Sequence, residues 1–301
     1  MRSRLHFEIQ WCGAALAAIA AFAACARSDR PGKTAAAAAP GHYALRGEIV
    51  AVNPARKTLT VMHEEIVGLM PAMTMDFQAA DGDLAIARVG EHIRADVVRA
   101  NGGLRLERIW PDDQADAGRV AQAANVLRQD TAARGAQAYR EIGEQMPDFA
   151  LYDQDGRVVQ AARFRGREIL LNFIYTRCPV ATMCPAATLR MMQVQQAARQ
   201  AGVKDLQLLS ITLDPAYDTP GVLKAYAEAR AIDTSNFAFL TGPEAAVRDL
   251  LTQFGIIAEF KDGLLRHSLA TLLIDPQGRI IHRADGSEWT VGEFVERMHK
   301  G

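Results

Sequence analysis

The chain has 301 residues, and its 34 lysines and arginines are balanced by 35 aspartates and glutamates. This length favours two modest domains over a single core. The balanced charge gives no overall field that would attract nucleic acid or hold the chain on anionic lipid, so we expect no nucleic-acid partner.

The N-terminus has the pattern of an export signal. Two arginines precede an apolar, charge-free run, Trp11 to Ala24, which at about 14 residues is shorter than the roughly 20 of a membrane span. The run ends in Phe22-Ala23-Ala24-Cys25, which resembles a bacterial lipobox, although phenylalanine stands where leucine is usual. We expect residues 1–25 to direct export and Cys25 to carry lipid on the periplasmic side of a bacterial membrane. Ordinary cleavage nearby, or an uncleaved signal that anchors the chain, are the alternatives.

Residues 26–41 are small and polar without apolar periodicity, which predicts a flexible tether. From 42 to 110 the chain alternates between short apolar and polar stretches, at 44–52, 58–62, 93–99 and 104–109, and Asn101-Gly102 is typical of a hairpin turn. So short a sheet must hide its edges and fill one core. We therefore predict a small all-β domain, an OB-like barrel of five strands.

The rest of the chain predicts a helical connector and an α/β domain. Residues 111–145 are rich in alanine, glutamine and arginine, with a break near Gly135. From 146 to 301 strands and helices alternate in a thioredoxin-like order, which makes the protein multidomain. The expected strands are 168–176, 206–213, 270–275 and 278–283, and the expected helices begin near 185, 220, 243 and 290.

Only Cys178 and Cys184 remain in the folded part, because Cys12 lies in the export signal and Cys25 is the expected lipid site. They stand where a buried strand passes into a helix, and Pro185 suits the first helical turn. Cys184 is then the expected N-cap, where the helix dipole favours a thiolate. The pair can converge if 178–183 is a loop, and then form a disulfide or share one metal ion. Two buried structural cysteines are the alternative.

Residues 146–300 resemble the SCO proteins, copper chaperones for the binuclear copper centre of cytochrome c oxidase. The matching segments are FIYTRCP at 173–179, Cys184-Pro185, ITLDPAYDTP at 211–220, FLTG at 239–242 and LIDPQGR at 273–279. The resemblance implies that Cys178, Cys184 and His267 bind copper, since thiolates select Cu(I) and an imidazole also allows Cu(II). Five residues separate the two cysteines where the family has three, and a longer loop could change the redox potential or the metal affinity.

Asp214 follows a central strand at its carboxyl end, the edge on which α/β sheets place their sites. It could orient a ligand by a hydrogen bond or help a partner dock. A carboxylate that merely starts the turn into the next helix is an equal alternative.

Four of the ten methionines lie between Met62 and Met75. Thioethers are soft donors that suit Cu(I), and two of them on Met73-Thr74-Met75 would project from one face of a strand. The segment resembles the periplasmic CusF-type copper-binding domain, which implies a site of His63, Met73 and Met75. Met70 stands near the place of the family's tryptophan and could be an extra sulfur donor or pack. Methionines that simply fill the core are the alternative.

The leading hypothesis is a metallochaperone, not an enzyme, that delivers copper to an oxidase subunit and could act on that partner's thiols. A thiol-disulfide oxidoreductase or peroxidase of the cell envelope is the first alternative, although the chain has no Cys-x-x-Cys motif. Copper resistance by sequestration is the second. The identity of the acceptor, copper transfer between the domains and the resting redox state of the two cysteines stay open.

Overall fold

The computed structural model describes residues 41–100, 102–135, 138–261 and 264–299. The expected export signal, the lipid site at Cys25, the tether up to residue 40 and Asn101 of the predicted hairpin lie outside these residues. Within the described ranges, no helix has both the length and the apolar character needed to cross a membrane.

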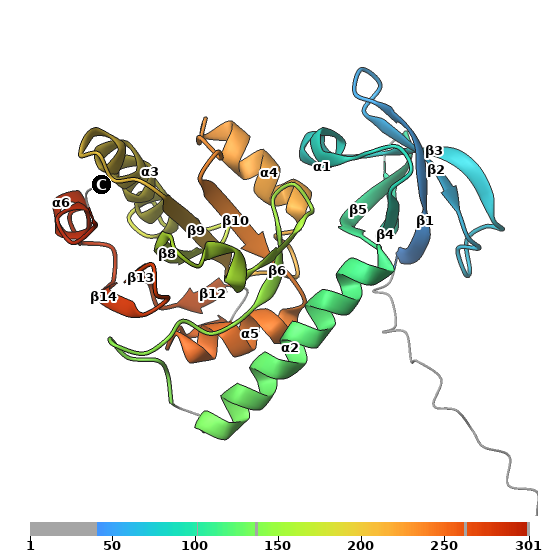
Figure 1. Cartoon of the computed structure of the whole chain (residues 1–301). Helices are drawn as coiled ribbons and strands as arrows, with labels where there is room; N and C mark the ends of the chain where they lie inside the picture. The colour runs from blue at the N-terminus through green and yellow to red at the C-terminus, as the bar shows by residue number, and fades with distance from the viewer. Residues whose placement is uncertain (1–40, 101, 136–137, 262–263, 300–301) are drawn as a thin grey trace, which may run out of the picture. The chain divides into compact units, whose positions relative to one another are not determined.

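The N-terminal domain is all-β apart from one short helix (Figure 1). Its strands pair in the order β1-β2-β3-β5-β4, and β4 pairs back onto β1, so that the sheet closes on itself. The four predicted strands are present with slightly wider bounds, and the strand that the patterning did not delimit, β3, carries two of the methionines. The elements are β1 His42–Asn53, β2 Thr58–His63, β3 Met73–Gln78, α1 Asp81–Ile86, β4 His92–Ala100 and β5 Gly103–Pro111.

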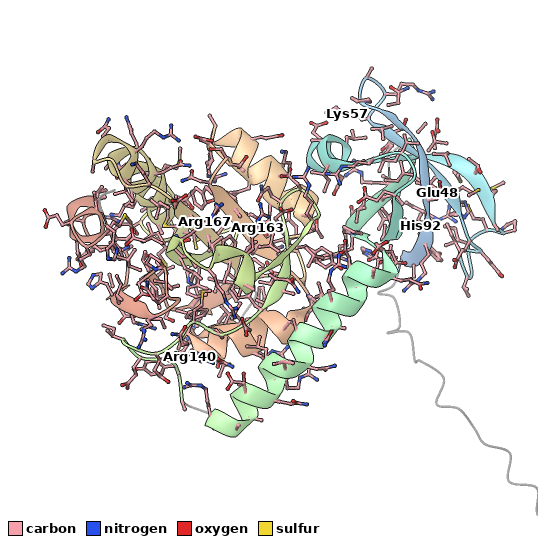
Figure 2. All side chains as sticks on the ribbon, viewed as in Figure 1. Glu48, Lys57, His92, Arg140, Arg163 and Arg167 are labelled. Carbon is pink, nitrogen blue, oxygen red and sulfur yellow. The ribbon has the colours of Figure 1, made fainter. Side chains whose placement is uncertain are left out.

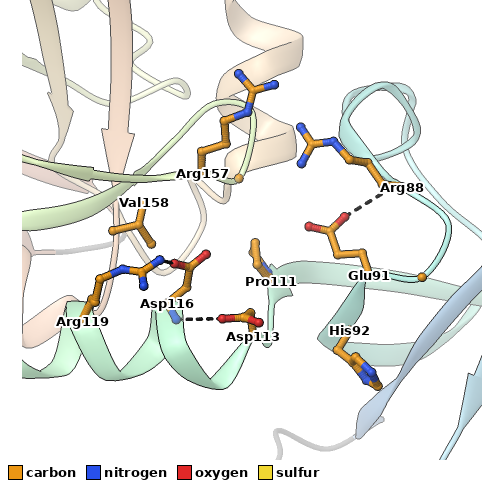
Figure 3. A pocket seen from close by; sticks show the side chains of 11 residues that line it. Arg88, Glu91, His92, Pro111, Asp113, Asp116, Arg119, Arg157 and Val158 are labelled. Carbon is orange, nitrogen blue, oxygen red and sulfur yellow. Dashed lines mark hydrogen bonds and ion pairs between the residues drawn. The ribbon is translucent and has the colours of Figure 1, made fainter.

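The connector contains one long helix, α2 Gln114–Arg134. Asp113 caps it, because its carboxylate accepts a hydrogen bond from the backbone N–H of Asp116 at 2.8 Å, as Figure 3 shows. The helix ends at Gly135, whose φ of 97° suits glycine, so the predicted break marks the end of the helix.

Helix α2 packs against α5, Glu244–Gln253. Leu127 is buried in the core of the α/β domain. The Gln253 side chain is fully buried and donates to Asp130 Oδ2 and Thr131 Oγ1, both at 2.9 Å. It accepts from Nε of Arg140, a residue labelled in Figure 2, at 2.7 Å, and Arg140 in turn donates to Asp130. The connector helix is therefore docked by buried polar contacts.

The second domain is a seven-stranded sheet in the order β14-β13-β8-β9-β10-β6-β7. β8, β9 and β10 are parallel, and β13 is antiparallel to β8. Besides α5, its elements are β6 Ala150–Asp153, β7 Val158–Gln160, the 3-10 helix Ala161–Phe164, β8 Glu168–Ile174, α3 Cys184–Gln200, β9 Leu206–Thr212, α4 Pro220–Ala229, β10 Phe237–Thr241, β11 Ala258–Lys261, β12 Leu264–His267, β13 Ala270–Ile274, β14 Ile280–Asp285 and α6 Val291–Val295.

The thioredoxin-like order is confirmed. One strand and two hairpins are present in addition to the predicted elements. β10 and the hairpins β6–β7 and β11–β12 consist of strands of only three to five residues, too short for alternation to stand out. The parallel pairing sets Ile174 at the end of β8 beside Thr212 at the end of β9. The loops that follow these two strands therefore leave the same edge of the sheet.

Candidate metal centre

Both cysteines belong to one segment, a loop that runs from a buried strand into a helix. All seven residues of β8 are buried, and α3 begins after an N-cap at Met183, with Pro185 in its first turn. Cys184 is thus the first helical residue, and its predicted N-cap position is wrong by one residue. Burial raises the pKa of the Cys184 thiol, in the direction opposite to the thiolate that the helix dipole was expected to favour. Loss of hydration is the largest cause of this rise, and backbone hydrogen bonds oppose it.

Cys178, Cys184 and His267 converge. Their donor atoms, two Sγ and one imidazole nitrogen, all lie within 4.8 Å of one another. Sγ of Cys184 lies 3.7 Å from Nε2 of His267. Both cysteines are free thiols, Cys184 buried and Cys178 partly exposed. Two soft sulfurs and one imidazole at this separation are a donor set that suits copper.

The His267 ring is held in the tautomer that a metal ligand needs. Its Nδ1 lies 3.1 Å from the carbonyl oxygen of Ser268 and donates to it, which leaves the lone pair on Nε2. Burial lowers the pKa of His267 and so favours the neutral ring. The histidine ends β12, and the pairing Ala258↔His267 fixes its place in the hairpin.

A buried carboxylate anchors the start of the cysteine loop. Asp218 accepts from the hydroxyl of Thr176 at 2.5 Å, from the Thr176 backbone N–H at 3.2 Å and from the hydroxyl of Thr212 at 2.6 Å. Burial raises the pKa of Asp218 to about 6, and these hydrogen bonds oppose that rise. No local pattern in the sequence predicts this role of Asp218, although the residue lies in the ITLDPAYDTP segment.

Asp214 does not contact any of the three donor atoms. Its buried carboxylate accepts from Arg177, the neighbour of Cys178, at 2.6 Å. The Arg177 guanidinium also lies over the ring of Tyr217, 3.8 Å from its centroid. Asp214 therefore contacts the cysteine loop through Arg177, which precedes Cys178 in the sequence, and not through one of the three candidate metal ligands.

In the N-terminal domain the strand register sets His63 and both methionines on one face. His63 is paired with Met73, and Val61 with Met75, and residues directly opposite in antiparallel strands share a face. His63 is buried at 3% exposure, and its Nδ1 bonds the carbonyl oxygen of Glu64 at 2.6 Å. Its Nε2 is buried without a hydrogen-bond partner among the described residues. An unpaired buried nitrogen on the same sheet face as two methionines fits a soft metal ion.

The four methionines of this segment differ in exposure. Met73 is 47% exposed, whereas Met75 and Met70 are half-buried and pack on the domain core. Met70 also pairs with Ile66 through two backbone hydrogen bonds, Ile66 N–H to Met70 O at 3.0 Å and Met70 N–H to Ile66 O at 3.1 Å. Met62 is 50% exposed and lies on the opposite face of β2 from His63.

Comparisons with known proteins match the two regions separately. The SCO1/SenC family model matches residues 137–300, and the model described as copper binding periplasmic protein CusF matches residues 42–111. The SCO1 protein homolog of Bacillus subtilis is 28% identical over 160 residues, which cover 52% of this chain and 81% of that protein. A SCO2-like protein of Rickettsia typhi is 32% identical over 148 residues, 47% of this chain and 68% of that protein.

Solved structures of the same group are also similar. A SCO1/SenC family lipoprotein from Bacillus anthracis aligns with a TM-score of 0.48 and 25% identity, over 53% of this chain and 96% of that chain. Bradyrhizobium japonicum ScoI with copper bound aligns with a TM-score of 0.43 and 26% identity, over 53% and 100%. The SCO1/SenC match extends over more than half of the sequence. This chain therefore belongs to the SCO1/SenC family of copper-binding proteins involved in cytochrome c oxidase assembly, and carries a CusF-like region before its SCO domain.

Proposed function

We propose that the protein is an exported copper metallochaperone with two copper sites. Residues 42–110 form an OB-like barrel domain that holds Cu(I) through His63, Met73 and Met75. Residues 111–145 join it to residues 146–301, which hold copper through Cys178, Cys184 and His267. The copper of the second site is cargo for a copper-accepting subunit of cytochrome c oxidase. The segment up to Cys25 exports the chain and anchors it to the membrane by lipid.

The observation that carries this proposal is the convergence of two thiols and a correctly oriented imidazole within 4.8 Å. Thiolates are soft, strong Cu(I) donors, and three donors leave room for a sulfur of the acceptor. Cys178 is the partly exposed member of the pair. An acceptor thiol would approach from its side and take the cargo by ligand exchange.

Anaerobic Cu(I) titration of the reduced full-length chain tests the proposal. Cys12 and Cys25 are replaced by serine in every sample, so that only the two site thiols remain. The parent binds two equivalents of Cu(I). Cys178→Ser, Cys184→Ser or His267→Ala removes the tight thiol site, and the pair Met73→Leu with Met75→Leu removes the thioether site. The matched control is Met62→Leu, which leaves both sites intact because Met62 lies on the opposite face.

If all of these variants keep two tight equivalents, the chaperone proposal is wrong. The pair of free thiols would then favour a thiol-disulfide oxidoreductase, because their sulfurs lie close enough for a modest loop movement to join them. Turnover of a model disulfide by the parent, absent in Cys178→Ser, would establish that function.

A further inference from the structure

Arg177, the residue before Cys178, is held on two sides. Its guanidinium donates to the Asp214 carboxylate at 2.6 Å and lies over the Tyr217 ring, 3.8 Å from the centroid. Asp214 is itself fixed, because its carboxylate is buried and its backbone carbonyl accepts from the N–H groups of Tyr217 at 3.1 Å and Asp218 at 2.8 Å. A planar guanidinium suits such a combined contact with a carboxylate and an aromatic face. We call Arg177, Asp214 and Tyr217 the arginine clamp.

The clamp lies at the less constrained end of the cysteine loop. Cys184 is fully buried as the first residue of α3, so its sulfur is placed by the helix. Cys178 is partly exposed and belongs to no helix or strand. The hydrogen bonds from the loop to Asp218 end at Thr176. Arg177 is therefore the last side chain before Cys178 that is tied to the turn after β9.

We infer that Arg177 is a positioning residue, which holds Sγ of Cys178 at a distance that suits a shared copper ion and opposes the closer approach that a disulfide requires. The inference rests on the proposed copper site. The donor atoms lie within 4.8 Å of one another, whereas two bonded sulfurs lie about 2 Å apart. Because Cys184 is placed by α3, Cys178 must make that approach and pull against the clamp. A copper ion between the sulfurs needs no such movement.

The clamp therefore affects two equilibria in opposite directions. Oxidised glutathione converts the two thiols into a disulfide: an S–S bond forms between the cysteines, the S–S bond of glutathione breaks, and its two sulfurs take up the two electrons and the two protons. Without the clamp Cys178 moves more freely, which favours this reaction. The same freedom lowers copper affinity, because a mobile ligand must be ordered when the ion binds.

Arg177→Met removes the clamp, in a chain in which Cys12 and Cys25 are replaced by serine. In glutathione buffers without metal, thiol titration gives the fraction of disulfide. We expect its equilibrium constant to rise about 10-fold, which lowers the reduction potential by about 30 mV. Cu(I) affinity of the thiol site, measured by chelator competition in the Met73→Leu, Met75→Leu background, falls about 10-fold.

Arg177→Lys separates position from charge. Lysine keeps the positive charge beside the thiols but does not reproduce the planar contacts with the carboxylate and the ring, so we expect both constants to shift in the same directions as in Arg177→Met. The matched control is Arg199→Met, at the far end of α3, which removes a guanidinium bonded to Asp233 at 2.8 Å and changes neither constant.

A folded Arg177→Met protein in which either constant stays at the parent value overturns the inference. An Arg177→Lys protein that behaves like the parent also overturns it, because charge alone would then explain the effect. A parent chain without a thiol-dependent Cu(I) site overturns the proposed function, whereas the glutathione equilibrium of the metal-free chain still reports whether the clamp holds Cys178. Should Arg177→Met fail to fold, as judged by circular dichroism, the lysine variant decides, since it keeps a cation beside the buried Asp214.

Discussion

Burial sets the protonation state of Cys184 and therefore the pH dependence of copper binding at the thiol site. Its pKa is raised, so the thiol keeps its proton throughout the neutral range and a bound copper ion must displace that proton. Each displaced proton makes affinity rise tenfold per pH unit, as long as the pH stays below the thiol pKa. The lowered pKa of His267 keeps the imidazole largely neutral, so that it adds little further dependence on pH.

We predict that Cu(I) affinity of the thiol site rises at least tenfold per pH unit between about pH 6 and pH 8. The measurement is competition with a Cu(I) chelator of known pH dependence, in the Met73→Leu, Met75→Leu background that isolates this site. The thioether site, isolated by Cys178→Ser with Cys184→Ser, is the comparison, because its methionines carry no proton to displace. An affinity at the thiol site that stays flat across this range would show that Cys184 is already a thiolate.

At the scale of elements, α2 is held in place by one buried amide. Gln253 on α5 bonds the side chains of Asp130 and Thr131 on α2 and accepts from Arg140. Gln253→Leu preserves much of the volume but removes these three hydrogen bonds. Asp130 and Arg140 keep their bond to each other, and Thr131 keeps its bond to the Leu127 carbonyl oxygen. Because a hydrogen bond whose groups keep other partners contributes about 1 kcal/mol net, we expect the helix to open about 1 kcal/mol more easily.

Hydrogen exchange measured by mass spectrometry checks this expectation. Peptides from 114–134 should exchange roughly 5-fold faster in Gln253→Leu, whereas the strands of the central sheet keep their protection. The control is Gln196→Leu, at an exposed position of α3, which leaves α2 unchanged. Equal protection of α2 in both variants would mean that Leu127 and its apolar neighbours dock the helix without the amide.

The sequence predicts the elements whose apolar patterns are long and leaves out those defined by distant contacts. The buried run of β8 and the proline after Cys184 were sufficient to place the cysteine loop. The hairpin that carries His267 was missed, because β11 and β12 have four residues each and include charged side chains. The resemblance, rather than any local pattern, supplied that histidine.

Contacts between residues far apart in the chain explain the other omissions. The rings of Tyr175 and His267 are in edge-on contact although the two residues lie far apart in the sequence. No local sequence pattern predicts that contact. The docking of α2 depends on Gln253, more than a hundred residues away from Leu127, Asp130 and Thr131. The protonation of Cys184 depends on how many neighbours bury it, which helix position alone does not specify.

At the scale of the whole molecule, the two sites differ in their response to oxidation. The thiol sulfurs of Cys178 and Cys184 lie within 4.8 Å, and a disulfide bond requires about 2 Å. A movement of the five-residue loop between them can bring the two sulfurs to bonding distance, because this loop is not paired with any strand. Two thiols then lose two protons and two electrons to the oxidant and become one disulfide, which has no thiolate left for copper. Thioethers cannot undergo this reaction, so the site of His63, Met73 and Met75 keeps its donors.

We therefore predict that oxidation halves the copper capacity of the full-length chain. With Cys12 and Cys25 replaced, the reduced protein binds two equivalents of Cu(I), and the protein treated with diamide, a thiol-selective oxidant, binds one. Thiol titration before copper addition should give two thiols and none, respectively. Met73→Leu with Met75→Leu lowers these capacities to one and zero, which assigns the oxidation-resistant equivalent to the thioether site. If the oxidised parent still bound two equivalents, the thiols would not be copper ligands, and if it bound none, the two sites would depend on each other.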